Sequence, residues 1–177
     1  MKAIKHVVFY VAFLLLIVSC SNHKEVVVIS KIEQSKNLVT NEEVNAALRH
    51  TAFFDKDSLV RLQAVKNLND EPTLKHVAYF DSIVSVRMLA TNKITNEVYL
   101  KHIAYFDEEE AVRCAAVNRI NSEAYLRHVA FFDESSKVKL LAISKIKSVS
   151  TLSHIIKFDE DAEIKKEAIN HLSNLKT

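Results

Sequence analysis

A 26-residue repeat constrains this chain more than any other feature of its sequence. Leucines recur at that interval without insertion, at Leu48, Leu74, Leu100, Leu126 and Leu152. The third copy, residues 100–125, is identical to the second, residues 74–99, at 14 of 26 positions. A period of roughly 20–50 residues is typical of a solenoid, in which each unit buries its apolar face against its neighbours. The sequence therefore predicts stacked copies that share one continuous core.

Each copy predicts two short helices. In the third copy the first helix carries Leu100, Ile103 and Ala104 at i, i+3 and i+4, which is one helical face. The second helix repeats this apolar periodicity from Val112 to Ile120. A polar turn that begins with an aspartate separates the two helices. A two-helix unit of this size cannot bury its apolar stripe alone, so the stripe must pack on neighbouring copies.

The composition agrees with helices joined by short polar loops. Gly is absent and there is one Pro among 177 residues, whereas tight β-hairpin turns depend on Gly. We therefore predict an all-α fold, an α-solenoid of about five two-helix repeats that occupies residues 41–177.

The repeat also resembles a known family. Its pattern, L-x-H-x-A-x-F-D-x(4)-V-R-x(2)-A-V-x-x-I, is similar to the short HEAT-like repeats of bacterial proteins over residues 48–177. The resemblance implies a right-handed α-solenoid, and a binding scaffold more often than an enzyme. The recurrent His and Phe are peculiar to this sequence, so the resemblance implies no role for them.

The N-terminus has the pattern of an export signal. Lys2 and Lys5 precede an apolar run of 12 residues, Val7–Val18, which is too short to span a membrane but suits a signal peptide. The run ends in Ser19 and Cys20, which resembles the bacterial lipobox. The resemblance implies that residues 1–19 are removed and that the Cys20 thiol is lipidated. An ordinary signal peptide with a chance cysteine and an uncleaved anchor are the alternatives.

This prediction places the protein in the bacterial cell envelope, lipid-anchored outside the cytoplasm, with the choice of inner or outer membrane open. Residues 20–40 would form a tether, in which Val26–Ile32 is a possible N-terminal capping helix.

Charge and cysteine content exclude some functions. The chain has 24 basic and 22 acidic side chains, and loss of Lys2 and Lys5 leaves 22 of each. No general basic field then attracts nucleic acid. Cys114 is the only other cysteine, so the mature chain has no disulfide framework. Cys114 is either a small packing residue, which we favour, or a reactive thiol.

Aspartate and arginine recur as a ladder that we expect to be structural. Its members are Asp55, Asp81, Asp107, Asp133, Arg61, Arg87 and Arg113. Each arginine falls in the first turn of a second helix, where a cation opposes the helix dipole, and within the apolar arc. The recurrent aspartate, from the same repeat or the next, is the group expected to offset both costs. Lys139 and Lys165 replace arginine in the last two copies, which predicts a looser end.

Five histidines also recur, at His50, His76, His102, His128 and His154. Equivalent residues in stacked helices lie roughly 8–10 Å apart, whereas zinc ligands lie about 2 Å from one ion. We therefore expect no metal and no cofactor here. Instead, we predict that His and Phe of one repeat pack on the aromatic residue of the next. A pH-sensing role and a metal site are the less favoured alternatives.

An outward stripe on the second helices is the candidate binding site for a protein partner. It consists of Lys93, Arg119 and Lys145 with Asn92 and Asn118 beside them. The stripe is either a solvated face or a partner-binding groove.

From these features we expect a monomeric scaffold that binds another protein through its solenoid surface. The recurrent Asp and His lack a neighbouring nucleophile and the chain has no Gly-rich phosphate loop, so we expect no enzyme. A structural or assembly spacer in the cell envelope is the alternative, and a cofactor-handling HEAT-like enzyme is a third possibility.

Overall fold

The computed structural model describes residues 41–175. The predictions for the signal peptide, for Cys20 and for the segment Val26–Ile32 lie outside these residues. The chain divides into two compact units, residues 1–68 and 69–177. Within residues 41–175 every regular element is a helix: there are ten helices and no strand. The predicted all-helical class is confirmed.

The described part of the first unit is one helix pair. Helix α3 (Asn41–Phe54) packs on α4 (Ser58–Asn67), and the connection between them is three residues long. Asp57 is the N-cap of α4, and its carboxylate accepts the amide of Leu59 at 2.9 Å. An oxygen-bearing side chain at this position satisfies one of the free amides at the start of a helix.

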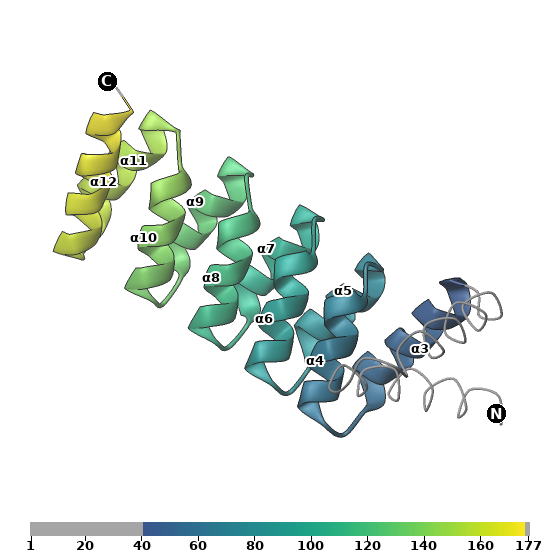
Figure 1. The fold of residues 1–177 in the computed structure, drawn as a ribbon. Coiled ribbons are helices and arrows are strands. Elements are labelled where there is room, and N and C mark those ends of the chain that lie inside the picture. The colour runs from purple at the N-terminus through teal and green to yellow at the C-terminus, as the bar shows by residue number, and fades with distance from the viewer. Residues whose placement is uncertain (1–40, 176–177) are drawn as a thin grey trace, which may run out of the picture. The chain divides into compact units, whose positions relative to one another are not determined.

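The second unit repeats this pairing (Figure 1). Its helices are α5 (Glu71–Phe80), α6 (Val84–Lys93), α7 (Glu97–Phe106), α8 (Glu110–Arg119), α9 (Glu123–Phe132), α10 (Ser136–Lys145), α11 (Val149–Phe158) and α12 (Ala162–Asn174). Each odd-numbered helix packs antiparallel on the even-numbered helix that follows it. The second helices α6, α8, α10 and α12 also contact one another in order, so neighbouring pairs stack through them.

The core of the second unit lies between the pairs. Its residues repeat at the predicted positions, and the fully buried ones include Ala78, Val86, Ala90, Ile94, Val112, Ala116, Ile120, Ala130, Val138 and Ile146. Small residues, mainly alanine, alternate with branched ones along the second helices. Alanine allows two helices to approach closely, and the branched residues fill the space between them. The repeated apolar stripe thus becomes one continuous core.

Glutamates at the starts of the first helices connect successive pairs. Glu71 accepts the hydroxyl of Thr95 at 2.6 Å and the amide of Asn96 at 2.9 Å. Glu97 accepts the amide of Asn121 in the same way, at 2.9 Å. Each glutamate therefore holds the chain that leads into the next pair, and these contacts repeat with the period of the sequence.

Candidate functional site

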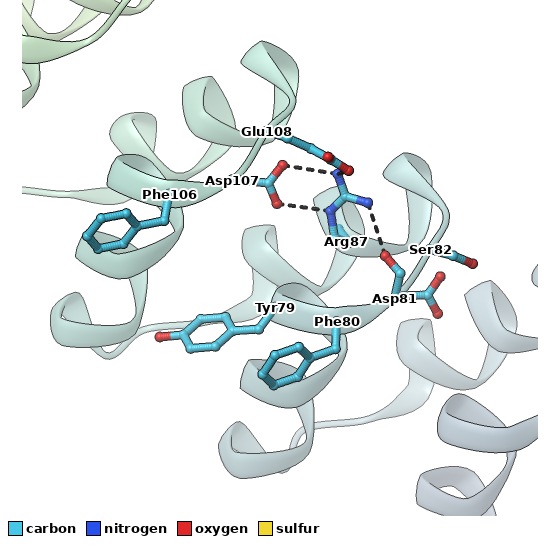
Figure 2. Close-up of a pocket in the computed structure, with 8 residues that line it drawn as sticks. All are labelled: Tyr79, Phe80, Asp81, Ser82, Arg87, Phe106, Asp107 and Glu108. Carbon is cyan, nitrogen blue, oxygen red and sulfur yellow. Dashed lines mark hydrogen bonds and ion pairs between the residues drawn. The ribbon is translucent and has the colours of Figure 1, made fainter.

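An open cleft separates the ends of the first helices α5 and α7 (Figure 2). Its volume is about 350 Å³. The residues that line it are Tyr79, Phe80, Asp81, Ser82, Arg87, Phe106, Asp107 and Glu108. They come from the end of a first helix, the turn that follows it, and the matching segment one period later. The cleft therefore belongs to the stacking of two neighbouring pairs.

A buried ion pair forms the floor of this cleft. The Arg87 guanidinium donates Nε and Nη2 to the two carboxylate oxygens of Asp107, at 2.9 and 3.0 Å, and Nη1 to the backbone oxygen of Asp81 at 3.0 Å. Arg87 therefore contacts the aspartate of its own pair through the backbone and the aspartate of the next pair through the side chain. The sequence left open whether the aspartate of the same repeat or that of the next repeat pairs with the arginine. The carboxylate comes from the next repeat, and the aspartate of the same repeat contributes its backbone oxygen.

The local sequence explains why the aspartate stands where the arginine can reach it. Helix α7 ends at Phe106, and the amide of the following Asp107 still donates to the oxygen of Ile103 at 3.0 Å. The Asp107 carboxylate then accepts the amide of Glu109 at 2.9 Å, two residues ahead. This side-chain turn is a conformation that aspartate favours. It fixes the carboxylate at the helix end, beside the guanidinium.

The next pair repeats this ion pair, and the pair after that has a weaker form of it. Arg113 donates Nε and Nη2 to Asp133 at 2.9 and 3.1 Å. Its Nη2 also lies 3.2 Å from the carboxylate of Glu134. One period later Lys139 makes a single contact of 3.6 Å with Asp159. A point charge replaces a two-pronged donor there, as the substitution predicted.

The first unit holds the remaining predicted ladder residues. The Arg61 Nη1 donates to the backbone oxygen of Asp55 at 3.0 Å, and Asp55 accepts the amide of Asp57 at 2.9 Å.

Exposed phenylalanines form the walls of the cleft. Each first helix of the second unit ends in one of them: Phe80, Phe106, Phe132 and Phe158, which we call the phenylalanine ladder. In the first unit, α3 ends in the equivalent Phe54. Their side chains are between 58% and 71% exposed. Their ring–ring contacts lie within their own helix. Phe106, for example, has its ring centroid 5.0 Å from that of His102 and 6.1 Å from that of Tyr105. Exposed rings that recur in this way are candidates for contact with a partner.

Histidines, and not the residues of the phenylalanine ladder, form the ring contacts between neighbouring helix pairs. Three such contacts lie in the second unit: Tyr79–His102, Tyr105–His128 and Phe131–His154. The first two are parallel stacks, with centroids 4.3 and 3.9 Å apart. The prediction that both His and Phe pack on the aromatic of the next repeat was therefore wrong in two respects. The histidine stacks on the aromatic residue of the preceding pair, and the phenylalanine stays at the surface because it is the last residue of its helix.

Two carboxylates of the cleft surround the guanidinium of Arg87. The Asp107 side chain is 7% exposed, whereas that of Glu108 is 84% exposed. The buried carboxylate makes the short two-pronged contact, and the exposed carboxylate of Glu108 lies 3.8 Å from Arg87 Nη2 at the edge of the cleft.

The stripe predicted on the second helices has contacts within the protein. Arg119 donates Nε to the oxygen of Ile94 at 2.8 Å, and Lys145 donates Nζ to the oxygen of Val117 at 2.9 Å. In both cases a cation near the end of one second helix covers the carbonyl end of the preceding one, where the helix dipole favours positive charge. Burial lowers the pKa of Lys145.

The other members of that stripe are Lys93, Asn92 and Asn118. Burial lowers the pKa of the Lys93 ammonium, and both asparagines are exposed. His171 extends the series, because its Nε2 lies 2.8 Å from the oxygen of Ile146. The sequence signal for this series was a basic residue or histidine at the 26-residue interval. This signal predicted an exposed stripe, whereas Arg119, Lys145 and His171 also contact the preceding helix pair.

Metal-ligating and nucleophilic side chains of the described residues bear on catalysis. They contain no group of three or more His, Cys, Asp or Glu side chains arranged to hold a metal ion. Cys114 is half-buried, and burial raises the pKa of its thiol, which reduces the reactive thiolate. Two of the recurring histidines, His102 and His128, lie in parallel ring stacks. The arrangement of the site suits binding through rings and carboxylates.

Comparisons with family models, with curated proteins and with solved structures gave no match to this chain. In residues 41–175, no helix is long and apolar enough to cross a membrane.

Proposed function

We propose that this protein is a lipid-anchored scaffold of the bacterial cell envelope, in which a HEAT-like solenoid of five repeats presents its surface to another protein. The N-terminal pattern that ends at Cys20 supports the anchor. Two or more acyl chains hold a protein stably at a membrane, since each buried methylene contributes about 0.8 kcal/mol. The anchor would confine the search for a partner to the membrane surface.

The phenylalanine ladder is the observation that carries the binding role. Burial of a phenylalanine side chain contributes roughly 1.5–3 kcal/mol of stabilising free energy, and a ring that stays in water does not contribute it. Here such rings recur at the end of each first helix and remain more than half exposed, and two of them, Phe80 and Phe106, line a cleft. Their ring–ring contacts lie within their own helix, unlike the histidine stacks that connect one pair to the next. A surface that a partner covers would account for these exposed rings.

Photo-crosslinking in the native bacterium tests the scaffold. Phe106 is replaced by benzoylphenylalanine in one strain and Val98 in another, because Val98 is an exposed apolar residue at the opposite end of the same helix. We expect one dominant protein to be captured from position 106 and little or none from position 98. Equal capture at both positions, or capture of no protein at position 106, would contradict a partner at the ladder.

The anchor is tested separately. In the Cys20→Ser variant we expect incorporation of labelled palmitate to be lost and the protein to leave the membrane fraction. Retention of the label in this variant would exclude Cys20 as the lipidated residue.

A further inference from the structure

We propose that residues 26–32 of this chain dock on the first helix pair and complete the array at its N-terminal end. The inference concerns a contact within the chain, so the docking goes beyond the proposed function and needs neither the partner nor the lipid. Two observations carry it. One face of the first pair leaves apolar side chains uncovered, and residues 26–32 contain the side chains that cover such a face elsewhere in the array.

The first pair exposes two apolar positions that every later pair buries. Val60 of α4 is 39% exposed. Its counterparts in the later second helices are completely buried: Val86, Val112, Val138 and Ile164. Leu48 of α3 is half-buried. Its counterparts in the later first helices are buried: Leu74, Leu100, Leu126 and Leu152. Among the five described pairs, the first is therefore the one in which both positions are uncovered.

The last described pair shows which neighbour supplies the cover. Leu152 of α11 and Ile164 of α12 are buried, although the described residues contain no helix pair after this one. Helix α12 contacts α10, the second helix that precedes it. A preceding pair therefore buries these two positions. The corresponding face of α3 and α4 is the face on which a preceding helix would pack.

Leu59 extends this face of the first pair. It is 72% exposed and lies next to Val60 at the start of α4. Its counterpart in α10 is Lys137, whose Nζ donates to the carboxylate of Glu110 in the preceding second helix at 2.8 Å. The position thus lies at the edge that meets the preceding pair. A leucine there, in place of the lysine, favours an apolar neighbour.

The residues that cover such a face are found by the opposite comparison. Ile143 of α10 is completely buried, whereas its counterpart Ile169 in α12 is 48% exposed. Ile146 is also completely buried, whereas its counterpart Leu172 is half-buried. Both positions lose burial in α12, which no described pair follows. They are therefore the positions that a second helix presents to the next pair.

Residues 28–32 carry the same two isoleucines. The stretch is identical to residues 142–146 at four of five positions, and Ile29 and Ile32 are the counterparts of Ile143 and Ile146. Eight residues, 33–40, then lead to the start of α3 at Asn41. Eight residues span up to about 26–29 Å, whereas packed helices lie about 8–10 Å apart. The segment can therefore reach the open face and present its isoleucines to it.

A second copy of the chain is the competing occupant. Ile169 and Leu172 of one copy would then meet Val60 of another, and such head-to-tail contacts extend into open filaments. A segment on a short linker has an effective concentration in the millimolar range at a site on its own chain. A second copy competes only at its own concentration. We therefore assign the face to residues 26–32 and treat self-assembly as an outcome of the test.

Together with the proposed anchor at Cys20, docking would set the distance of the solenoid from the membrane. Residues 21–25 alone would join the lipidated residue to the docked segment, and five residues span at most about 18 Å. The whole stretch 21–40 would span up to about 70 Å. The docked segment would therefore hold the first helix pair close to the bilayer.

Hydrogen exchange of the purified full-length protein, followed by mass spectrometry, tests the docking. We expect the amides of residues 28–32 to exchange at least tenfold more slowly in the wild type than in the double variant Ile29→Asp, Ile32→Asp, because carboxylates do not enter an apolar contact. The matched control is Ser30→Asp. Its counterpart Ser144 is exposed, so this variant should keep the protection of the wild type. Equal exchange in the wild type and in the double variant overturns the inference.

Photo-crosslinking of the same purified protein identifies the occupant. Benzoylphenylalanine at position 60 should crosslink to residues 26–32 of its own chain, and at position 169, on the exposed face of α12, it should not. A crosslink from position 60 to α12 of a second copy, seen as a covalent dimer, overturns the inference and assigns the face to self-assembly. Any other result in which position 60 fails to reach residues 26–32 also overturns it. Neither measurement involves the partner or the lipid, so failure here is distinguishable from failure of the proposed function.

Discussion

Removal of Arg113 provides the sharpest test of how the helix pairs hold together. Its side chain is 6% exposed and that of its partner Asp133 is 4% exposed. The guanidinium makes two bonds to that carboxylate and two more to the backbone oxygens of Asp107 and Glu108, at 3.0 and 3.1 Å. In Arg113→Ala the Asp133 carboxylate keeps the amide of Ser135, at 2.8 Å, and loses its counter-charge.

The expected loss is large because a buried charge is left without its partner. Truncation of one member of a buried ion pair typically costs about 3–5 kcal/mol. Because the Asp133 carboxylate retains a backbone donor, we expect a loss at the low end of this range, about 3 kcal/mol. For a chain of this size that corresponds to a decrease of roughly 10 °C in the melting temperature. Urea unfolding followed by circular dichroism at 222 nm measures the free energy directly.

The chain contains its own control at the equivalent position of the next pair. Lys139 makes one contact of 3.6 Å with Asp159, and both side chains are more exposed than those of the arginine pair. Lys139→Ala should therefore cost about 1 kcal/mol or less. Arg113→Lys should fall between the two, because it keeps the charge and loses the two-pronged geometry. A loss below about 1 kcal/mol for Arg113→Ala, or equal losses for Arg113→Ala and Lys139→Ala, would refute the reasoning.

Two other predictions concern the remaining contacts between pairs. Arg119→Met and Lys145→Met should each lower the free energy of unfolding by about 1 kcal/mol, because each leaves a helix-end carbonyl without its donor. If urea unfolding shows no change in either variant, these residues only form a solvated face and do not stabilise the stacking. The hydroxyl of Thr95, followed by backbone amides, holds the pKa of Glu71 below its usual range. Its contribution to stability is therefore present above about pH 4.3 and is lost as the pH falls through the lowered pKa. Melting temperatures of Glu71→Gln should accordingly fall less than those of the wild type between about pH 5 and pH 3, and parallel curves would contradict this assignment.

The fold could be predicted from the sequence because the apolar residues that repeat every 26 positions are also the residues that form the core. Leu100, Ile103 and Ala104 repeat at 26 residues because stacked pairs need the same buried positions, and all three are buried. The aspartate that follows each first helix was also recognisable, since it ends the helix and fixes the turn. The replacement of arginine by Lys139 predicted a weaker pair, and the single long contact to Asp159 agrees with it.

The candidate site was harder to predict because the period alone does not say which repeated residues are buried. Phe106 lies beside His102 on a helical wheel, which assigned both to the boundary between repeats. The ring of Phe106, the last residue of its helix, is 69% exposed, while the histidine lies in a stack with Tyr79. The role of Arg119 was missed for a related reason, because its acceptor is a backbone carbonyl, which sequence does not display.

The difference between these repeated positions is what makes the phenylalanine ladder informative. Repetition of Arg113, His128 or Glu97 is explained by a contact that each makes with a neighbouring pair. Stacking alone would therefore preserve them in every copy. For Phe106 the ring–ring contacts lie within its own helix, and most of its surface is exposed. Replacement of Phe106 by a polar residue should therefore change the stability of the array little, whereas the proposed scaffold function predicts that the same replacement removes the binding of a partner.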